Sequence, residues 1–557
     1  MLKRTLRLLV AVLVVNGFLL GAQWLFPPVG SPPSWFALEA MFVAGMFLMF
    51  PSNRGVLPAA VLVSTGVVAV AVLSFADAAT RVILARPLNL YLDARLANSV
   101  VDLLVGTMGS PAAALTGVLT AVALVGAVAG LTHVIRSVGS ETRADGRGGS
   151  VAGVALMIPM VIWILIPGVS SGWDGGPWSR LATPAFTMIG TQAGRMRETV
   201  AEREIFEADL AASSAGQVEI PGLLARLSGR DVILAFIESY GVSVLDDPRY
   251  SVVVEPRLEE LGSRMAAAGL SLVSGTLVAP TQGGQSWFSH GSLLSGLWLD
   301  NQLRYDLMLS SDRETLIDDF RHAGYRTVAL MPAITFAWPE GEQLGYDEIF
   351  ASPDIEYAGP ALNWVTMPDQ FLWSFLERNI RGKHDSTGSE GEDAPVFVEV
   401  GLISSHAPWT PILEVLEDWS SIGNGEVFER WAGAGERPED LWLDTQRVQE
   451  QFALSVDYAI GAMSSYAENF VDRDVLLIAL GDHQPAALIT GDGASWEVPV
   501  HIISGDPELV KPFLDWGFQP GGIPAREHPD RGMDAFRGWF LQSYSGLGDE
   551  AIESDGG

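Results

Sequence analysis

The chain begins with long apolar runs and continues, after about residue 170, with short apolar runs that alternate with amphipathic stretches. The five long runs are residues 8–26, 35–50, 56–75, 112–135 and 151–169. Most of them reach the roughly 17–25 residues that a helix needs to cross a bilayer. Residues 35–50 are the weakest candidate, because the run is short and contains Glu39. The pattern predicts a transmembrane domain of five helices over residues 1–171.

Basic residues predict how these helices are oriented. Lys3, Arg4 and Arg7 precede the first run, and further arginines follow the second and fourth runs. These segments share one side if every run crosses, and that side is expected to be the cytoplasm. Arg81, Arg86 and Arg95 argue the other way, but their loop is longer and also contains aspartates. The large carboxyl-terminal part is therefore expected outside the cytoplasm, with the first run retained as a helix rather than removed as a signal peptide.

The second part of the chain has the alternation typical of an α/β domain. Buried strands are predicted at residues 232–237, 327–330, 396–403 and 475–480, and amphipathic helices at 315–322 and 446–470. Such an order favours a largely parallel central sheet covered by helices. We expect an interfacial, helical linker at 172–228, a catalytic domain at 229–545 and a disordered acidic tail at 546–557.

Charge and composition exclude several classes of function. Residues 1–171 hold 10 basic and 6 acidic residues, so the remainder of the chain holds 24 basic and 60 acidic residues. Such an acidic domain repels nucleic acid at long range. The chain contains no cysteine, which excludes disulfides, thiolate ligands and a cysteine nucleophile.

Polar residues stand where two of the predicted strands end. Glu238 follows the strand at 232–237, and Asp482 and His483 follow the strand at 475–480. An adjacent Asp and His at the carboxyl end of a strand can ligate a divalent metal ion. Alone, Glu238 would be interpreted as a helix N-terminal acid or a salt-bridge partner.

Two further clusters contain candidate reactive groups. Ser286 ends a Gly-Gly-Gln-Ser turn before an apolar helix, where it is either an N-cap or a nucleophile that faces a metal ion. His406 follows the strand at 396–403, where it is either a structural hydrogen-bonding residue or a catalytic one.

In chain order, the motifs IESYG, GGQSWFSHGSLLSG, ISSHAPW and LGDHQP resemble those of the alkaline-phosphatase-like superfamily. The chain looks most like its membrane-bound branch, which contains lipoteichoic acid synthases and phosphoglycerol or phosphoethanolamine transferases. The resemblance implies that Glu238, Asp482 and His483 are metal ligands. It further implies that Ser286 is the nucleophile and a ligand, at a position where most members carry Thr, and that His406 contacts the transferred phosphoryl group.

The chain departs from this family at two places. Glycerol-phosphate binders carry Trp-x-Arg before a GYD motif, whereas this chain has Trp338-Pro339-Glu340. Trp338 is still expected to pack against substrate, but Glu340 removes a bidentate phosphate clamp and favours an amine-bearing group. The C/S-x-P-x-R sequence of classical sulfatases is absent around Ser286, so sulfate hydrolysis is not expected.

The resemblance implies a membrane enzyme that moves a phosphoglycerol- or phosphoethanolamine-type group from a phospholipid to a cell-envelope glycan or polymer, through a phospho-seryl intermediate. The alternatives are a phosphatase or phosphodiesterase with the same site and a catalytically inactive scaffold. One imidazole with carboxylate and hydroxyl oxygens suits Mn, which we expect, or Mg or Zn. The expected location is a bacterial inner membrane, with the catalytic domain periplasmic or extracellular.

Overall fold

The structure is a computed structural model that divides into two compact units. The first comprises Met1–Val82 and Arg86–Glu202, and the second comprises Ile83–Ala85 and Arg203–Gly557. The described residues are 2–27, 33–50, 54–96, 100–101, 104–105, 108–139, 146–165, 180–214, 220–382, 394–491, 493–526 and 531–546. Most of the predicted acidic tail therefore lies outside the described residues.

The first unit has three helices, within its described part, that are long and apolar enough to cross a membrane. They are α1 (Leu2–Leu25), α3 (Leu57–Leu84) and α6 (Ser110–Val138). The helices α2 (Leu38–Leu48) and α7 (Gly146–Leu165) offer only shorter apolar segments. The prediction of five spans is therefore wrong by this criterion, and three candidates remain.

Polar contacts explain why the second predicted span is short. Residues 36–37 form strand β1 (Phe36–Ala37), which pairs in parallel with β2 (Leu181–Ala182) instead of continuing a helix. Glu39 then accepts hydrogen bonds through Oε1 from the backbone N–H groups of Ala185 (3.1 Å) and Phe186 (3.4 Å), at the start of α8 (Pro184–Ser214). These bonds use the carboxylate as a helix cap, a role that an uninterrupted apolar span does not provide.

The fifth predicted span also forms only a short apolar helix. The apolar part of α7 is Ser150–Leu165, which at 1.5 Å per residue is about 24 Å long, against about 30 Å of hydrocarbon. Its glycine allows close packing: a Cβ added at Gly153 would lie 2.7 Å from the carbonyl oxygen of Gly45 on α2. Small residues at such a contact are typical of helices that associate within a membrane.

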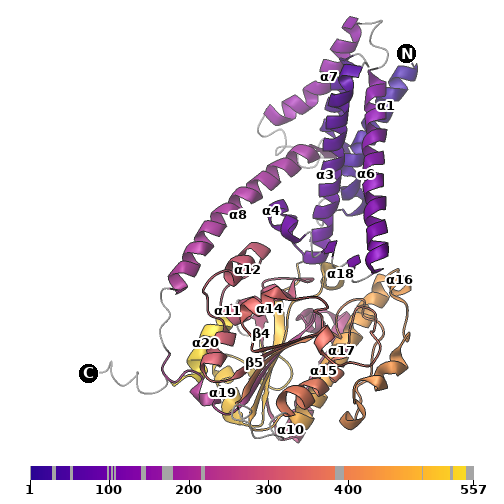
Figure 1. Ribbon diagram of the computed structural model, residues 1–557. Coiled ribbons are helices and arrows are strands. Elements are labelled where there is room, and N and C mark those ends of the chain that lie inside the picture. Colours follow the sequence, from indigo (N-terminus) through magenta and orange to yellow (C-terminus); the bar gives the residue numbers. More distant parts are fainter. Residues whose placement is uncertain are drawn as a thin grey trace. The chain divides into compact units, whose positions relative to one another are not determined.

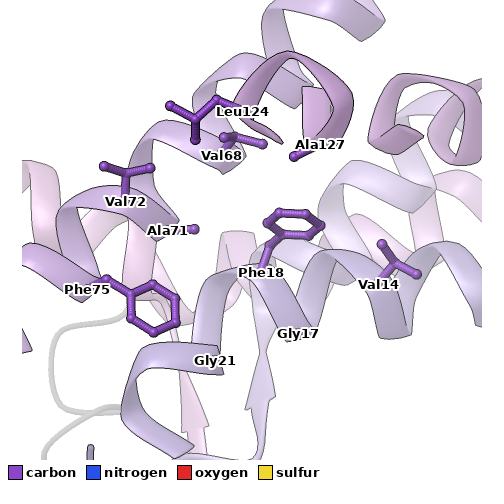
Figure 2. A pocket seen from close by; sticks show the side chains of 10 residues that line it. All are labelled: Val14, Gly17, Phe18, Gly21, Val68, Ala71, Val72, Phe75, Leu124 and Ala127. Carbon is purple, nitrogen blue, oxygen red and sulfur yellow. The ribbon is translucent and has the colours of Figure 1, made fainter. Parts of the chain in front are cut away.

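The helices α1, α3 and α6 line an open apolar pocket of about 490 Å³, shown in Figure 2. Its lining includes the small residues Gly17, Gly21 and Ala71 and the aromatic residues Phe18 and Phe75. All of its lining side chains are apolar, so the pocket has no group that could carry out chemistry.

The second unit is built on an eight-stranded sheet with the strand order β10-β4-β9-β8-β3-β7-β5-β6. The strands are β3 (Asp231–Ile237), β4 (Ser271–Val278), β5 (Arg326–Met331), β6 (Glu348–Ala351), β7 (Val396–Leu402), β8 (Val475–Gly481), β9 (Glu497–Ser504) and β10 (Gln519–Pro520). From β8 to β6 the neighbours are parallel, and from β10 to β8 they are antiparallel. The central sheet is therefore mostly parallel, as predicted, but it is a mixed sheet because the strands from β10 to β8 pair antiparallel.

The connection between β8 and β9 accounts for the change of direction. Among the described residues of 482–496 the only helix is the four-residue α18 (Ala487–Thr490), which is shorter than the helix that usually forms the crossover between parallel strands. The chain therefore turns back on itself, and β9 pairs antiparallel with β8.

Helices cover both faces of this sheet, as Figure 1 shows. On one face, α10 (Pro248–Ala267), α15 (Asp369–Phe375) and α17 (Thr445–Phe470) pack against alternate residues of β3. The other face is covered by α11 (Ser286–Ser295), α12 (Gln302–Leu309), α13 (Leu316–His322), α19 (Pro507–Asp515) and α20 (Ala535–Tyr544). Side chains alternate between the faces along each strand, so every buried strand contributes to both cores.

The remaining α-helices among the described residues are short. They are α4 (Leu90–Asp93), α9 (Ser243–Asp246), α14 (Pro339–Leu344) and α16 (Pro438–Leu441). The four predicted strands correspond to β3, β5, β7 and β8, and the two predicted helices to α13 and α17.

The strand register sets where the site lies. Ile237, the last residue of β3, is paired with Gly481 of β8 on one side and with Leu402 of β7 on the other. The residues that follow these three strands therefore meet at one edge of the sheet. Open α/β proteins bind ligands at this edge.

Candidate metal centre

Glu238, Asp482 and His483 come together at this edge. One ligand atom from each lies within 4.8 Å of the others. The Nε2 atom of His483 is 3.6 Å from Oε1 of Glu238 and 3.5 Å from Oδ2 of Asp482. The two predicted clusters are thus brought from positions 244 residues apart into a single group, because β3 and β8 are parallel neighbours.

Each of these side chains is held by a neighbouring group. Oδ1 of Asp482 accepts hydrogen bonds from the backbone N–H groups of Ser239 (2.8 Å) and His483 (2.7 Å). Nδ1 of His483 lies 2.9 Å from the carbonyl oxygen of Gln484, so the ring donates there and directs Nε2 toward the carboxylates. The hydroxyl of Ser239 donates to Oε1 of Glu238 at 2.7 Å. Second-shell bonds of this kind orient metal ligands in proteins.

The electrostatics of the cluster suit a divalent cation. Burial and then the nearby Glu238 carboxylate raise the pKa of Asp482 to about 6, although His483 opposes the change. Burial lowers the pKa of His483, but the charges of Asp482 and Glu238 outweigh burial and leave the pKa above its usual value. Two carboxylates and an imidazole nitrogen form the donor set that Mn, Mg or Zn accepts. The residues present therefore fit the predicted metal.

Ser286 lies against this cluster. Its Oγ atom is 3.2 Å from Nε2 of His483, and its side chain also donates a hydrogen bond to Asp482. Gln285, rather than Ser286, occupies the N-cap position of α11, with a left-handed φ of 66° that is uncommon for a residue other than glycine. The backbone N–H of Gly283 donates to the carbonyl of Gln484 at 2.8 Å, which fastens the turn to the segment after His483.

His406 follows β7 at the same edge, in a segment tied to the cluster. Oδ1 of Asp369 accepts hydrogen bonds from the N–H groups of Ile403 (2.9 Å) and Ser404 (2.8 Å). The hydroxyl of Ser405 donates to the carbonyl oxygen of Glu238 at 2.6 Å. The strand end that carries His406 is therefore fixed beside Glu238.

The His406 ring is itself buried and oriented. It stacks on Trp364 with 3.7 Å between ring centroids, and its Nδ1 atom lies 2.5 Å from the carbonyl oxygen of Ala407. Burial lowers the pKa of His406 to about 4, and the charge of His483 lowers it further. At neutral pH the imidazole is therefore uncharged, with its proton on Nδ1 and a lone pair on Nε2.

Trp338 and Glu340 lie at a different place in the second unit, next to α14. The Trp338 ring stacks on Tyr346 of the GYD motif, with centroids 6.4 Å apart. The charge of Glu340 is one of those that raise the pKa of Tyr305, after burial. These contacts place Trp338 near Tyr346 and Glu340 near Tyr305. Within the described part of the chain, none of these contacts involves a metal ligand.

Three residues of the site were not predicted: Ser239, Trp364 and Asp369. Ser239 stands beside Glu238 in the IESYG motif, but only its φ of 55° and its two hydrogen bonds reveal that it orients both carboxylates. Trp364 lies in an irregular segment without periodicity, and Asp369 begins a short helix, so neither carries a sequence signal that points to His406.

No family model matches the chain, and no curated protein matches it. Similar solved structures include the lipoteichoic acid synthase LtaP from Listeria monocytogenes, at 11% identity and a TM-score of 0.37, covering 60% of this chain and 77% of that one. The Streptococcus pyogenes phosphoglycerol transferase GacH, solved with sn-glycerol-1-phosphate, matches at 14% identity and a TM-score of 0.36, covering 62% and 80%.

The C-terminal periplasmic domain of EptC from Escherichia coli matches at 13% identity and a TM-score of 0.31, covering 53% of this chain and 75% of that one. The activities named for LtaP and GacH are among those of the group that the four motifs resemble. The chemistry of the site rests on the contacts described above.

Proposed function

We propose that the chain is a membrane-anchored, metal-dependent enzyme that transfers a substituted phosphoryl group through a covalent intermediate on Ser286. The observation that carries the proposal is the position of the Ser286 hydroxyl, 3.2 Å from Nε2 of His483, at the edge of a cluster with Glu238 and Asp482. A hydroxyl fixed beside a metal centre is a typical activated nucleophile.

Glu238, Asp482, His483 and Ser286 would hold the cation, with Mn expected. When bound, a divalent cation stabilises the deprotonated hydroxyl and the charge on the phosphoryl oxygens. The turn at Gln285 and the start of α11 orient Ser286 for attack on phosphorus, and the bonds from Ser239 keep both carboxylates in place.

In the first step, the Ser286 oxygen forms a bond to phosphorus and the bond from phosphorus to the lipid alcohol breaks. The proton of Ser286 leaves with that alcohol, so diacylglycerol is released. In the second step, an acceptor hydroxyl attacks phosphorus, and Ser286 departs and regains a proton. His406 is predicted to contact the transferred group. Because its neutral ring has a lone pair on Nε2, we assign His406 the role of general base, which accepts the proton of the entering hydroxyl.

A phospholipid is the proposed donor, and a cell-envelope glycan or polymer is the proposed acceptor. Three apolar helices long enough to cross a membrane support a lipid substrate, because they would keep the enzyme at the bilayer that contains it. The arginine distribution supports a periplasmic or extracellular catalytic unit.

The test incubates purified full-length protein in detergent with Mn²⁺ and phospholipids labelled in the headgroup phosphate. We expect release of unlabelled diacylglycerol and a labelled peptide that contains Ser286. Ser289→Ala is a matched control, because Ser289 is a buried serine on the same helix. Label that passes only to water would indicate the hydrolase alternative. Absence of headgroup cleavage with every lipid class would refute the proposal.

A further inference from the structure

A buried carboxylate and an imidazole form a pair next to the site that the proposed mechanism does not use. Glu399 lies in the middle of β7 and is 1% exposed. Its Oε1 atom is 2.6 Å from Nδ1 of His290, and its Oε2 accepts a hydrogen bond from the hydroxyl of Tyr346. A polar group is costly to bury within an apolar strand unless it is hydrogen-bonded, and both oxygens of Glu399 have a partner.

His290 lies on the same helix as Ser286. The two residues are four positions apart on α11, which places them on one face of the helix. Helical side chains tilt toward the helix N-terminus, so the His290 ring lies over the turn that carries Ser286. The ring also stacks on Phe236, the residue two positions before Glu238 in the chain.

The orientation of the ring leaves one nitrogen available. One ring face stacks on Phe236 of β3, with 3.7 Å between centroids and 18° between planes. Nδ1 is directed at Glu399, and in an imidazole Nε2 points almost the opposite way. Within the described residues Nε2 has no hydrogen-bond partner, and 17% of the side chain is exposed. Nε2 is therefore the ring nitrogen that remains for a further hydrogen bond.

We propose that His290 is a further catalytic residue, whose Nε2–H donates a hydrogen bond to a non-bridging oxygen of the transferred phosphoryl group. Glu399 is the positioning residue that accepts from Nδ1, and Tyr346 fixes Glu399. When the ring carries a proton on each nitrogen, it donates from Nδ1 to Glu399 and from Nε2 to the phosphoryl oxygen at the same time. This inference rests on the proposed function, because it assigns a substrate contact in that reaction.

The pair of His290 and Glu399 connects the surroundings of Ser286 with those of Trp338. Tyr346 stacks on Trp338 and bonds to Glu399, which bonds to His290, which lies over Ser286. The residues predicted to contact the substituent are thereby connected to the nucleophile through three side chains. His290 lies between the surroundings of Ser286 and those of Trp338, so it can contact the phosphoryl group.

The test compares wild type with His290→Asn in the full-length, Mn-loaded enzyme. An Asn amide can replace Nδ1 toward Glu399, but it has no counterpart of Nε2. We expect unchanged metal content and melting temperature, with kcat lowered about 100-fold, as for loss of one oxyanion-stabilising donor. Inhibition by inorganic phosphate is expected to weaken about tenfold. His322→Gln, an exposed histidine on α13, is the control and should match wild type.

Imidazole rescue separates a catalytic role from a structural one. Adding imidazole should restore part of the activity of His290→Ala but none in a His290→Ala, Glu399→Gln double variant, because Glu399 is needed to hold the ring. A His290→Asn enzyme with wild-type kcat and wild-type phosphate inhibition would overturn the inference.

The two proposals can fail separately. If wild type transfers no headgroup, the proposed function fails. Phosphate binding, measured by thermal shift, then still tests whether His290 contacts phosphate. Equal phosphate affinities in wild type and His290→Asn would refute this contact. Weaker phosphate binding in the variant would support it. If His290→Ala does not fold, His290→Asn alone carries the comparison.

Discussion

The proposed metal-binding side and the proposed substituent-binding side of the site are built differently. Asp482 and His483 are 2% and 1% exposed, and backbone groups of adjacent residues hold both of them. Trp338 and Glu340 lie instead at the start of the six-residue helix α14, after Phe336, which is 59% exposed. The first side is rigid because it is part of the strand ends, whereas the second lies on a surface connection.

This difference separates chemistry from specificity. Groups that take part in bond making must be held closely, and strand ends with backbone hydrogen bonds supply that precision. A short surface element tolerates substitution without loss of the fold, so it can determine which substituent is accepted. Changes on the metal-binding side should therefore abolish activity, and changes near α14 should redirect it.

The largest effect is expected for Ser286→Ala. This change removes the only atom that can form the proposed covalent intermediate, so turnover should fall to the background rate while the fold is retained. Activity with labelled phospholipid and the intact mass of the protein are the measurements. Full activity in the variant, or an adduct that maps to Ser289, would show that Ser286 is not the nucleophile.

Asp482→Asn and His483→Ala should each lower bound metal and activity together. Both remove a donor atom of the cluster, whose members lie within 4.8 Å of one another. Elemental analysis beside turnover is the measurement, and Asp515→Asn on α19, outside the cluster, is a control for the loss of one carboxylate. Active wild-type enzyme without stoichiometric divalent metal would contradict the assignment.

Metal affinity should fall as the pH falls through about 6. The pKa of Asp482 is raised to about 6 by burial, and the pKa of His483 is also raised, so protons compete with the cation below that value. Above it the Asp482 carboxylate is ionised, and the remaining pH dependence should come from His483, whose pKa is raised by the charges of Asp482 and Glu238. Each displaced proton lowers the affinity about tenfold per pH unit. Calorimetric titration of Mn²⁺ from pH 5 to 8 tests this, and a flat profile would argue against Asp482 as a ligand.

Ser239→Ala should weaken metal binding without removing a ligand. The hydroxyl of Ser239 donates to Glu238 at 2.7 Å, and loss of such an orienting bond typically costs about 10- to 100-fold in metal affinity or activity. The backbone N–H bond to Asp482 survives the change, so some binding should remain. An unchanged Mn²⁺ affinity would show that the carboxylate of Glu238 is held without this bond.

The smallest effect on rate, and the largest on selectivity, is expected for Glu340→Arg. At an effective dielectric of about 20, a charge about 4 Å away is worth roughly 4 kcal/mol before desolvation, so reversing it can change substrate preference. The ratio of phosphatidylglycerol to phosphatidylethanolamine turnover at fixed salt should rise about tenfold or more. Glu342→Arg, on the exposed part of α14, is the matched control. An equal ratio in both variants would show that Glu340 does not face the headgroup.

Much of the catalytic unit could be predicted from local patterns. The apolar runs that became β3, β5, β7 and β8 are short, rich in aliphatic residues and bounded by polar residues, so they could be recognised as buried strands. Glu238, Asp482 and His483 follow such runs directly. Parallel strands place their carboxyl ends at one edge, so the meeting of these three residues followed from the order of elements.

Other features depended on contacts between distant residues. The length of α2 is set by Glu39, which caps a helix 146 positions away, and no apolar pattern reports that bond. The antiparallel direction of β9 depends on the short return through α18. His290 and Glu399 are 109 positions apart, and each looks like an isolated polar residue within an apolar element. Periodicity reports which side of an element is buried, whereas the partner of a buried polar group is selected only when the elements pack.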